Sequence, residues 1–475
     1  MSAVIKYLKR NQKTHLNQLL ELLAIPSVST DVKRKPAMKK AATWMQKRLK
    51  AVGCTTAKIH ATPGHPIVYG EWLGAEGRPT ILVYGHYDVQ PVDPLKLWKI
   101  PPFEPTVKQG KIFARGASDD KGQLITHVNA LGAYIAETGE CPVNIKFLIE
   151  GEEEIGSPNL ETFIKNNRSM LACDAVVVSD TSMFDKGLPA ITYGLRGLAY
   201  LQIDVVGTDR DLHSGSFGGS VVNPANALVG MLAALKDANG RISVPGFYDR
   251  VKRLSVVERR AFAELPHSDR RFKQEIDAPE LQGESGYTTL ERIWGRPSLD
   301  INGIWSGFTG EGAKTVIPAE AHAKVSMRLV PDQTPKEIAR QVSHYLKKLA
   351  PKSVKVTVND LHGGDAWVTP REHPVLVAAG KALERAFSKA PVYIREGGSI
   401  PVIATFDKLL KAPTALVGFG LNDDNLHAPN EKFDLDCFYK GMEASAYLME
   451  ELAELNSKPS KNSSGGARKR VGRTK

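Results

Sequence analysis

The sequence predicts an α/β protein in which a mostly parallel central sheet, flanked by helices, carries an inserted α+β unit with a four-stranded sheet. Three observations support this fold class. Residues 1–191 alternate between helical patterns and short apolar runs, which is typical of a parallel sheet. After Gly194 the pattern changes to strand, helix, strand, strand, helix, strand, a compact α+β arrangement. An apolar run of the first kind then returns at 414–420. A chain of 475 residues also exceeds the size of one hydrophobic core, so two domains are expected.

The elements of the first unit follow from apolar spacing. Leu16, Leu19, Leu20 and Leu23 mark one face of an amphipathic helix. Short runs rich in β-branched residues and bounded by turn residues predict buried strands, and four of them are found at 80–85, 143–149, 175–178 and 415–420. Each of these runs is followed by a side chain that can bind a metal. Because ligands of open α/β sheets collect at the carboxyl ends of strands, the four runs together predict one site.

The second unit contains the strands 198–205, 321–329 and 354–358 and the helices 225–235 and 335–349, with a less regular stretch at about 240–300. Its small sheet has a free edge, where a second copy of the chain is expected to pair. A candidate ligand, His427, must join residues from before position 191, which predicts an insertion. The predicted domains are 1–191 with 398–456, the inserted unit 192–397, and a disordered basic tail at 457–475.

Composition narrows the class of protein. A hydrophobic content of 42% and a charged content of 24% are typical of a soluble globular protein, and no apolar run is long enough to span a membrane. The start lacks the features of a secretory signal, and four scattered cysteines without a CxxC pair argue against disulfides and thiolate zinc sites. A reducing cytoplasm is therefore expected. The net charge is +11, but seven basic residues lie in the tail, so no specific nucleic-acid partner is predicted.

Two short motifs offer nitrogen and oxygen ligands. His86 and Asp88 lie two apart at a strand end, so both can point to one side, and Asp88 can accept a hydrogen bond from the ring nitrogen that does not bind metal. Asp119 and Asp120 lie in a glycine-flanked loop before a helical pattern. One aspartate can cap that helix, but capping does not require the second.

The run Glu152, Glu153 and Glu154 follows the second strand. Three adjacent carboxylates repel one another unless a cation offsets them, and a divalent metal would let one ligate while its neighbour remains a free base. These residues alone do not decide which glutamate plays which part. With Asp180 and His427 they complete a set of two histidines and several carboxylates without cysteine, which favours Zn²⁺ over Mn²⁺ or Co²⁺. Neither a P-loop nor a G-x-S-x-G elbow is present.

Together these motifs resemble the family of di-zinc exopeptidases and amidases that contains carnosinases, aminoacylases, succinyl-diaminopimelate desuccinylases and glutamate carboxypeptidases. The resemblance covers about 15–450 and rests on five motifs, at 85–89, 115–122, 150–157, 179–180 and His427. The inserted unit is most similar to the carnosinase branch, through segments at 213–215, 312–318, 327–331, 362–364 and 397–401.

The resemblance implies a role for each site residue. Asp119 would bridge two divalent metals, with His86 and Asp180 completing one site and Glu154 and His427 the other. The E-E-x-G-S register of the family makes Glu153 the general base, and Asp88 would orient His86. The remaining implied residues act on the substrate: His213 from the partner subunit of a homodimer on the oxyanion, Arg328 on the terminal carboxylate, and Thr315, His362 and Ser399 as further contacts.

The expected activity is hydrolysis of the amide bond of dipeptides or similar small peptides by a water shared between two metal ions. One alternative is an N-acyl-amino-acid deacylase, since the same metals cut either amide. A second alternative is an inactive relative that serves as a binding protein. Arg328 and the carnosinase-like insertion favour a peptide with a free carboxylate.

Overall fold

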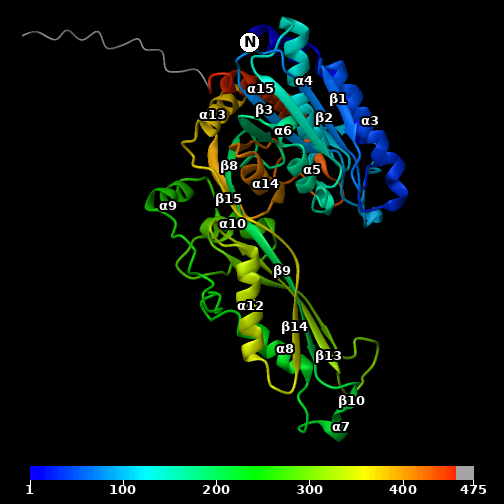
Figure 1. The fold of residues 1–475 in the computed structure, drawn as a ribbon, viewed down its shortest axis with the longest axis vertical. Helices are drawn as coiled ribbons and strands as arrows, with labels where there is room; N and C mark the ends of the chain where they lie inside the picture. The colour runs from blue at the N-terminus through cyan, green and yellow to red at the C-terminus, as the bar shows by residue number, and fades with distance from the viewer. Residues whose placement is uncertain (456–475) are drawn as a thin grey trace, which may run out of the picture.

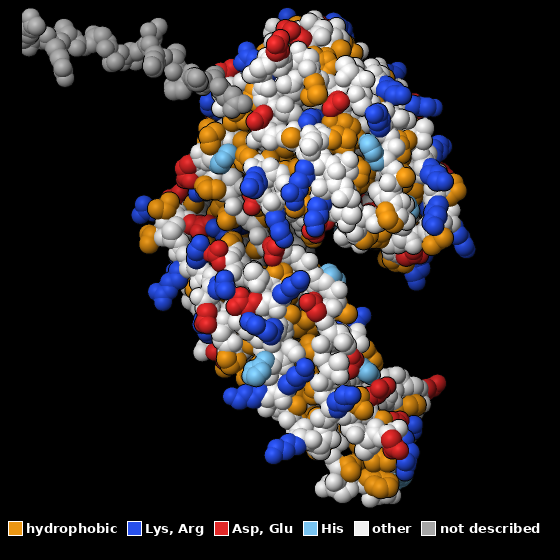
Figure 2. Space-filling view, in the orientation of Figure 1, with side chains coloured by type: hydrophobic (Ala, Val, Ile, Leu, Met, Phe, Trp, Pro, Cys, Tyr) orange, Lys and Arg blue, Asp and Glu red, His pale blue; other side chains and the backbone are white. Residues whose placement is uncertain are grey.

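The computed structural model describes residues 1–455, so the predicted basic tail at 457–475 lies outside the described residues. The described chain forms two lobes joined at a narrow waist (Figure 1). The lobe with the N-terminus contains the large sheet, and the second, elongated lobe is built on a separate four-stranded sheet. Figure 2 shows a deep notch between the lobes on one side of the molecule.

The large sheet has nine strands in the order β1-β2-β6-β3-β7-β17-β8-β15, with β16 also pairing with β8. Its central strands β6, β3, β7 and β17 are parallel to one another, which confirms the predicted fold class. The strands are β1 (Thr56–His60), β2 (Ile67–Trp72), β3 (Thr80–His86), β6 (Asn144–Glu150), β7 (Ala175–Val178), β8 (Ala190–Leu195), β15 (Trp367–Val368), β16 (Val392–Glu396) and β17 (Thr414–Leu416).

Helices cover both faces of this sheet, which explains why its central strands are apolar at consecutive positions. Successive residues of β3 point to opposite faces of the sheet: Val83 lies in one hydrophobic core and Leu82 in another. The first core is completed by α1 (Ser2–Arg10), α2 (Gln12–Leu23), α3 (Lys35–Ala51), α4 (Lys121–Thr138), α13 (Pro374–Phe387) and α15 (Leu435–Leu452). The second is completed by α5 (Leu160–Asn166), α6 (Arg168–Leu171) and α14 (Pro401–Leu410).

The second lobe is an antiparallel sheet in the order β11-β13-β9-β14, as the predicted α+β unit requires. Its strands are β9 (Gly197–Val206), β11 (Ser298–Ser306), β13 (Glu320–Leu329) and β14 (Lys355–Gly364). Helices α8 (Pro224–Ala233) and α12 (Pro335–Leu349) pack on one face and bury alternate strand residues such as Leu201 and Val325. The opposite face carries half-buried polar side chains, including that of Arg328.

The junction between the units differs in detail from the expected boundaries. Residues 367–396, expected within the insertion, form β15, α13 and β16, which pair with β8 or pack on the core of the nine-stranded sheet. The less regular stretch contains α9 (Val256–Ala263), α10 (Asp269–Glu275) and α11 (Thr289–Gly295), and Phe262 and Trp294 from it lie in that same core. We therefore propose that the main domain resumes near Trp367 and also holds these helices.

Short elements complete the fold. A three-stranded sheet joins β18 (Lys432–Asp434), β5 (Lys111–Phe113) and β4 (Thr106–Lys108). At the far tip of the second lobe, β10 (Leu212–His213) pairs with β12 (Val316–Ile317) beside α7 (Ser214–Phe217). The 3-10 turns are η1 (Val32–Arg34), η2 (Leu95–Leu97) and η3 (Glu153–Ile155). Within residues 1–455, no helix is both long enough and apolar enough to cross a membrane.

Candidate metal centre

The ends of four parallel strands and the start of one helix place the predicted ligands. His86 is the last residue of β3, and Asp180 follows β7 by two residues. Glu154 lies in the η3 turn after β6, and His427 lies in the loop after β17. Asp119 comes directly before the N-cap of α4. Because parallel strands end at the same edge of a sheet, side chains far apart in sequence converge there.

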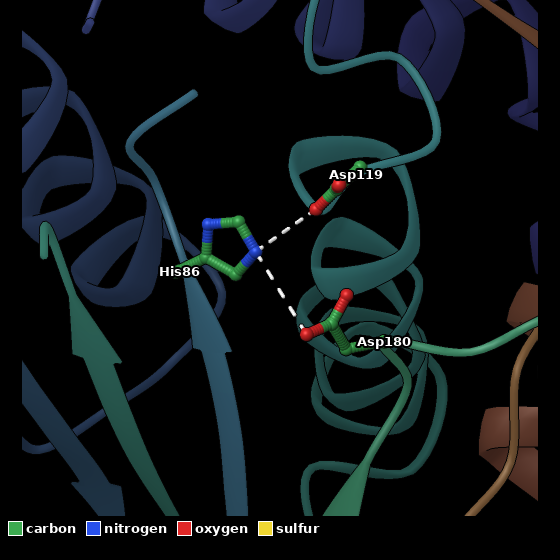
Figure 3. A group of neighbouring side chains, drawn as sticks. All are labelled: His86, Asp119 and Asp180. Atoms are coloured by element: carbon green, nitrogen blue, oxygen red, sulfur yellow. Dashed lines mark hydrogen bonds and ion pairs between the residues drawn. The ribbon is translucent and has the colours of Figure 1, made fainter. Parts of the chain in front are cut away.

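Asp119 lies between the two histidines. Its Oδ1 is 3.1 Å from Nε2 of His86, and its Oδ2 is 3.0 Å from Nε2 of His427. Asp180 Oδ2 is 3.9 Å from the same nitrogen of His86 (Figure 3), and Glu154 Oε2 is 3.3 Å from that of His427. Two ligand groups therefore share one carboxylate, with their donor atoms within 4.8 Å of one another in each group.

The negative charges of the carboxylates in this cluster are not balanced by basic side chains of the described residues. No Lys or Arg in the described residues forms an ion pair with Asp119, Glu154 or Asp180. Burial, and then repulsion from Asp119, raises the pKa of Glu154 to about 8, and the same two causes raise the pKa of Asp180 well above its usual range. Divalent cations would remove this repulsion, and two histidine nitrogens with three carboxylates are a donor set that suits them. The residues present therefore fit two metal ions.

Asp88 orients His86 from the side away from the cluster. Nδ1 of His86 is 3.1 Å from the backbone oxygen of Asp88 and 3.4 Å from its Oδ1, which leaves Nε2 to face Asp119. Oδ2 of Asp88 accepts the backbone N–H of Glu154 at 3.1 Å. Asp88 thus connects a histidine of one ligand group to the backbone of a glutamate in the other, as carboxylates behind metal-binding histidines commonly do.

The three consecutive glutamates have different surroundings. Glu152 accepts the backbone N–H of His65 at 2.9 Å and Nδ2 of Asn159 at 2.8 Å, so its carboxylate is held away from the ligands. Glu154 faces His427. The carboxylate of Glu153 accepts no hydrogen bond from the described residues, and burial, with the nearby Asp119 and Asp88 charges, raises the pKa of its carboxyl. The surroundings of the three glutamates therefore distinguish them, which their residue type alone could not do.

Comparison with known proteins decides the family. A family model described as "Peptidase family M20/M25/M40" matches residues 82–451. The chain belongs to this family. It is 34% identical over 96% of its length to the Cys-Gly metallodipeptidase dug1 of Schizosaccharomyces pombe, of which 99% is covered. It is 32% identical over 96% of its length to the human Beta-Ala-His dipeptidase, of which 93% is covered.

Solved structures agree with this assignment. The crystal structure of human carnosine dipeptidase 1 superposes with a TM-score of 0.81 at 31% identity, covering 95% of this chain and 98% of that one. The predicted resemblance to the carnosinase-like branch is therefore confirmed, and the chain is a peptidase of the M20/M25/M40 family.

In this peptidase, sequence reasoning missed the residue that fixes the backbone around Asp119. Glu431 is fully buried, and its Oε2 accepts Nη1 of Arg115 and the N–H of Gly116, both at 2.9 Å. Its Oε1 accepts the N–H groups of Ser118 at 3.0 Å and Asp119 at 3.1 Å. The loop that holds His427 is thereby tied to the loop that holds Asp119. The only sequence signal is an acid four residues after a candidate ligand.

Two predicted substrate residues lie far from the metal ligands of their own chain. His213 and Thr315 are at the tip of the second lobe, where the backbone oxygen of Thr315 accepts the N–H of Ser214 (Figure 1). Nδ1 of His213 accepts the N–H groups of Gly215 at 3.0 Å and Ser216 at 3.2 Å, so its proton lies on Nε2. The single chain therefore does not bring His213 to the cluster.

The other predicted substrate residues lie on the open face of the small sheet or near the waist. Nη1 of Arg328 donates to Oγ of Ser399 at 3.0 Å. His362 contacts Tyr200 edge to face, with ring centroids 5.2 Å apart. Arg328 and Ser399 are thus brought together. His362 lies on β14, which is separated from β13, the strand of Arg328, by β9.

Proposed function

We propose that this peptidase hydrolyses the peptide bond of dipeptides or similar small peptides with two bound divalent metal ions. The observation that carries the proposal is the position of Asp119 between His86 and His427, each with a further carboxylate beside it. The dipeptidase names of the two relatives support a small peptide substrate.

The contacts within the cluster support a metal-binding role for each ligand. We propose that Asp119 bridges the two ions, with His86 and Asp180 on one and Glu154 and His427 on the other. When bound, such ions polarise a carbonyl and lower the pKa of water. Zn²⁺ is the proposed ion, and Mn²⁺ or Co²⁺ are alternatives, because nitrogen and oxygen ligands without thiolates accept all three.

Glu153 is the proposed general base. Its carboxylate lies beside the ligand cluster without a hydrogen-bond donor from the described residues, and burial raises its pKa above the usual range of a glutamate. Such a group can take a proton from water and return it to the leaving amine, because acid–base catalysis is most efficient when the pKa is near the working pH. Asp88 keeps His86 in place during this exchange.

A second subunit would complete the site. Within residues 1–455 the Nε2–H of His213 has no acceptor, so it could donate to a developing oxyanion if another copy of the chain delivered it to the site. The small sheet offers a surface for pairing: β11 is an edge strand, and Ile301, Ile304 and Trp305 on it are exposed. We therefore propose a homodimer formed through the second lobe, with Thr315 reaching the same site. Light scattering of the purified protein tests the dimer.

The substrate would be held by its carboxylate. Arg328 and Ser399 form the proposed binding pair, with His362 as a further contact on the open face of the small sheet. The cysteines among the described residues are all unpaired, which supports a reducing compartment such as the cytoplasm.

A substrate panel tests the proposal. The metal-free protein, reloaded with Zn²⁺ or Mn²⁺, would be assayed with Cys-Gly, β-Ala-His and Ala-Gly and with N-acetyl and N-succinyl amino acids. Cleavage of dipeptides only supports the proposal. Cleavage of acylated amino acids only would make the chain a deacylase, and a purified protein that binds no metal would indicate a binding protein.

A further inference from the structure

Arg196 lies at the junction between the lobes, because it is the single residue between the end of β8 and the start of β9. Its side chain is nine-tenths buried, with 9% exposed. Nε donates to the backbone oxygen of Gly397 and Nη1 to that of Arg296, each at 3.2 Å. Nη2 donates to no group in residues 1–455, and no carboxylate forms an ion pair with this guanidinium there. Arg196 is thus a buried cation without a counter-charge.

The arginine beside it shows the arrangement expected of a buried cation. Arg296 donates Nε and Nη2 to the two carboxylate oxygens of Glu284, both at 2.7 Å. A buried charge of either sign is strongly unfavourable without such a partner. Glu284 therefore neutralises the charge of Arg296, whereas no carboxylate of the described residues neutralises that of Arg196.

A second unpaired arginine lies close to the first. Burial, and then repulsion from Arg328, lowers the pKa of Arg196 to about 10. Arg328 likewise forms no ion pair with a described residue, and Nη1 donates to Oγ of Ser399. Oγ of Ser399 in turn donates to the backbone oxygen of Arg196 at 2.5 Å. One hydroxyl therefore connects the side chain of one arginine to the backbone of the other.

Asp300 is the acid whose charge acts on both arginines. Asp300 attracts each of them electrostatically but forms no ion pair with either, and its own side chain is largely exposed and lies 3.6 Å from Nζ of Lys236. Glycine at 397 leaves the space beside Nη2 open, since a Cβ there would lie 2.8 Å from that nitrogen. Because no carboxylate of residues 1–455 forms an ion pair with either arginine, an anion from outside these residues would balance the two guanidinium groups.

We propose that Arg196 is a specificity-determining residue that binds the terminal carboxylate of the peptide substrate together with Arg328 and Ser399. Two guanidinium groups supply several charge-assisted donors that a carboxylate accepts, and Ser399 holds the two groups beside each other. The site lies where the chain passes from one lobe to the other. A bound substrate carboxylate would therefore contact residues at the boundary of both lobes. This inference rests on the proposed peptidase activity and names the substrate group that the junction recognises.

The experiment compares Ala-Gly with its terminal amide, Ala-Gly-NH2, under steady-state conditions. The proteins are the metal-loaded wild type, R196Q, R196K and the control R241Q, which changes a half-exposed arginine that also pairs with Glu284. The wild type should prefer the free carboxylate. R196Q should reduce that preference about tenfold to 100-fold, mainly through KM, because charge-assisted hydrogen bonds contribute that much to discrimination. R241Q should keep the wild-type ratio within twofold.

Several results would overturn the inference. If R196Q lowers cleavage of both peptides equally, Arg196 only supports the fold. If the wild type cleaves both peptides equally well, no carboxylate is recognised, although the peptidase activity stands. If the wild type cleaves neither, the proposed function fails and the inference with it. Should R196Q not fold, R196K decides: loss of the planar fork should lower the preference severalfold, and an unchanged ratio refutes the role.

Discussion

The substitution E431Q tests how firmly the loops of the metal centre are held. Glutamine has the shape of the native side chain, but its NH2 group would replace an oxygen that accepts two hydrogen bonds, and Arg115 would lose its buried counter-charge. Removing one partner of a buried ion pair costs about 3–5 kcal/mol. We expect the free energy of unfolding of the metal-free protein to fall by that amount.

The same change should weaken metal binding. Glu431 accepts the backbone N–H of Asp119 and lies four residues after His427, so both ligand-bearing loops depend on it. Residues that hold metal ligands in place typically contribute 10–100-fold to affinity, and we expect a loss of about that size. Urea unfolding of the metal-free protein measures the first effect, and competition with a chelator for Zn²⁺ measures the second.

A matched control lies on the same segment. D436N changes an exposed aspartate paired with Lys440 on α15, and its effect on stability should be under about 0.5 kcal/mol. If E431Q kept both the unfolding free energy and the Zn²⁺ affinity of the wild type, the Asp119 loop would hold its shape without Glu431, and the argument from its four hydrogen bonds would be refuted.

Three further predictions concern single residues. E153Q should lower kcat by about 100-fold to 10⁴-fold while metal content, measured by elemental analysis, stays unchanged; near-normal turnover would exclude Glu153 as the base. G64A and E152A should both slow catalysis, because Glu152 holds the turn that carries Glu153 and Glu154 and a Cβ at position 64 would lie 1.6 Å from its Oε1. Wild-type kinetics in both variants would show that Glu152 does not position its neighbours. Burial, and then the Arg48 charge, lowers the pKa of His15 to about 4, so the unfolded chain binds more protons below pH 6.5. Stability should therefore fall by about 2–3 kcal/mol between pH 7 and 4.5 through this residue, and H15Q should flatten the pH profile of urea unfolding by that amount.

The sequence by itself determined the fold class and the candidate ligands. Buried parallel strands are apolar at most consecutive positions, so their runs stand out, and the polar residues that follow them meet at one edge of the sheet. For that reason His86, Asp180 and His427 could be predicted as neighbours although His427 lies more than 300 residues after His86. The spacing of the ligands also carried the family resemblance, which the comparisons confirmed.

Only the tertiary structure decided which side chains hold that site in place. Glu152 is separated from Glu153 and Glu154 by hydrogen bonds to His65 and Asn159, and such contacts leave no periodic pattern in a sequence. Glu431 reaches backbone groups more than 300 residues away. Likewise, residues 374–387 were expected within the insertion, but as α13 they pack on the core of the nine-stranded sheet, because a sequence pattern does not say which of two sheets a helix covers. Apolar periodicity indicates that one face of an element is buried, but only the folded chain shows which other element that face packs against.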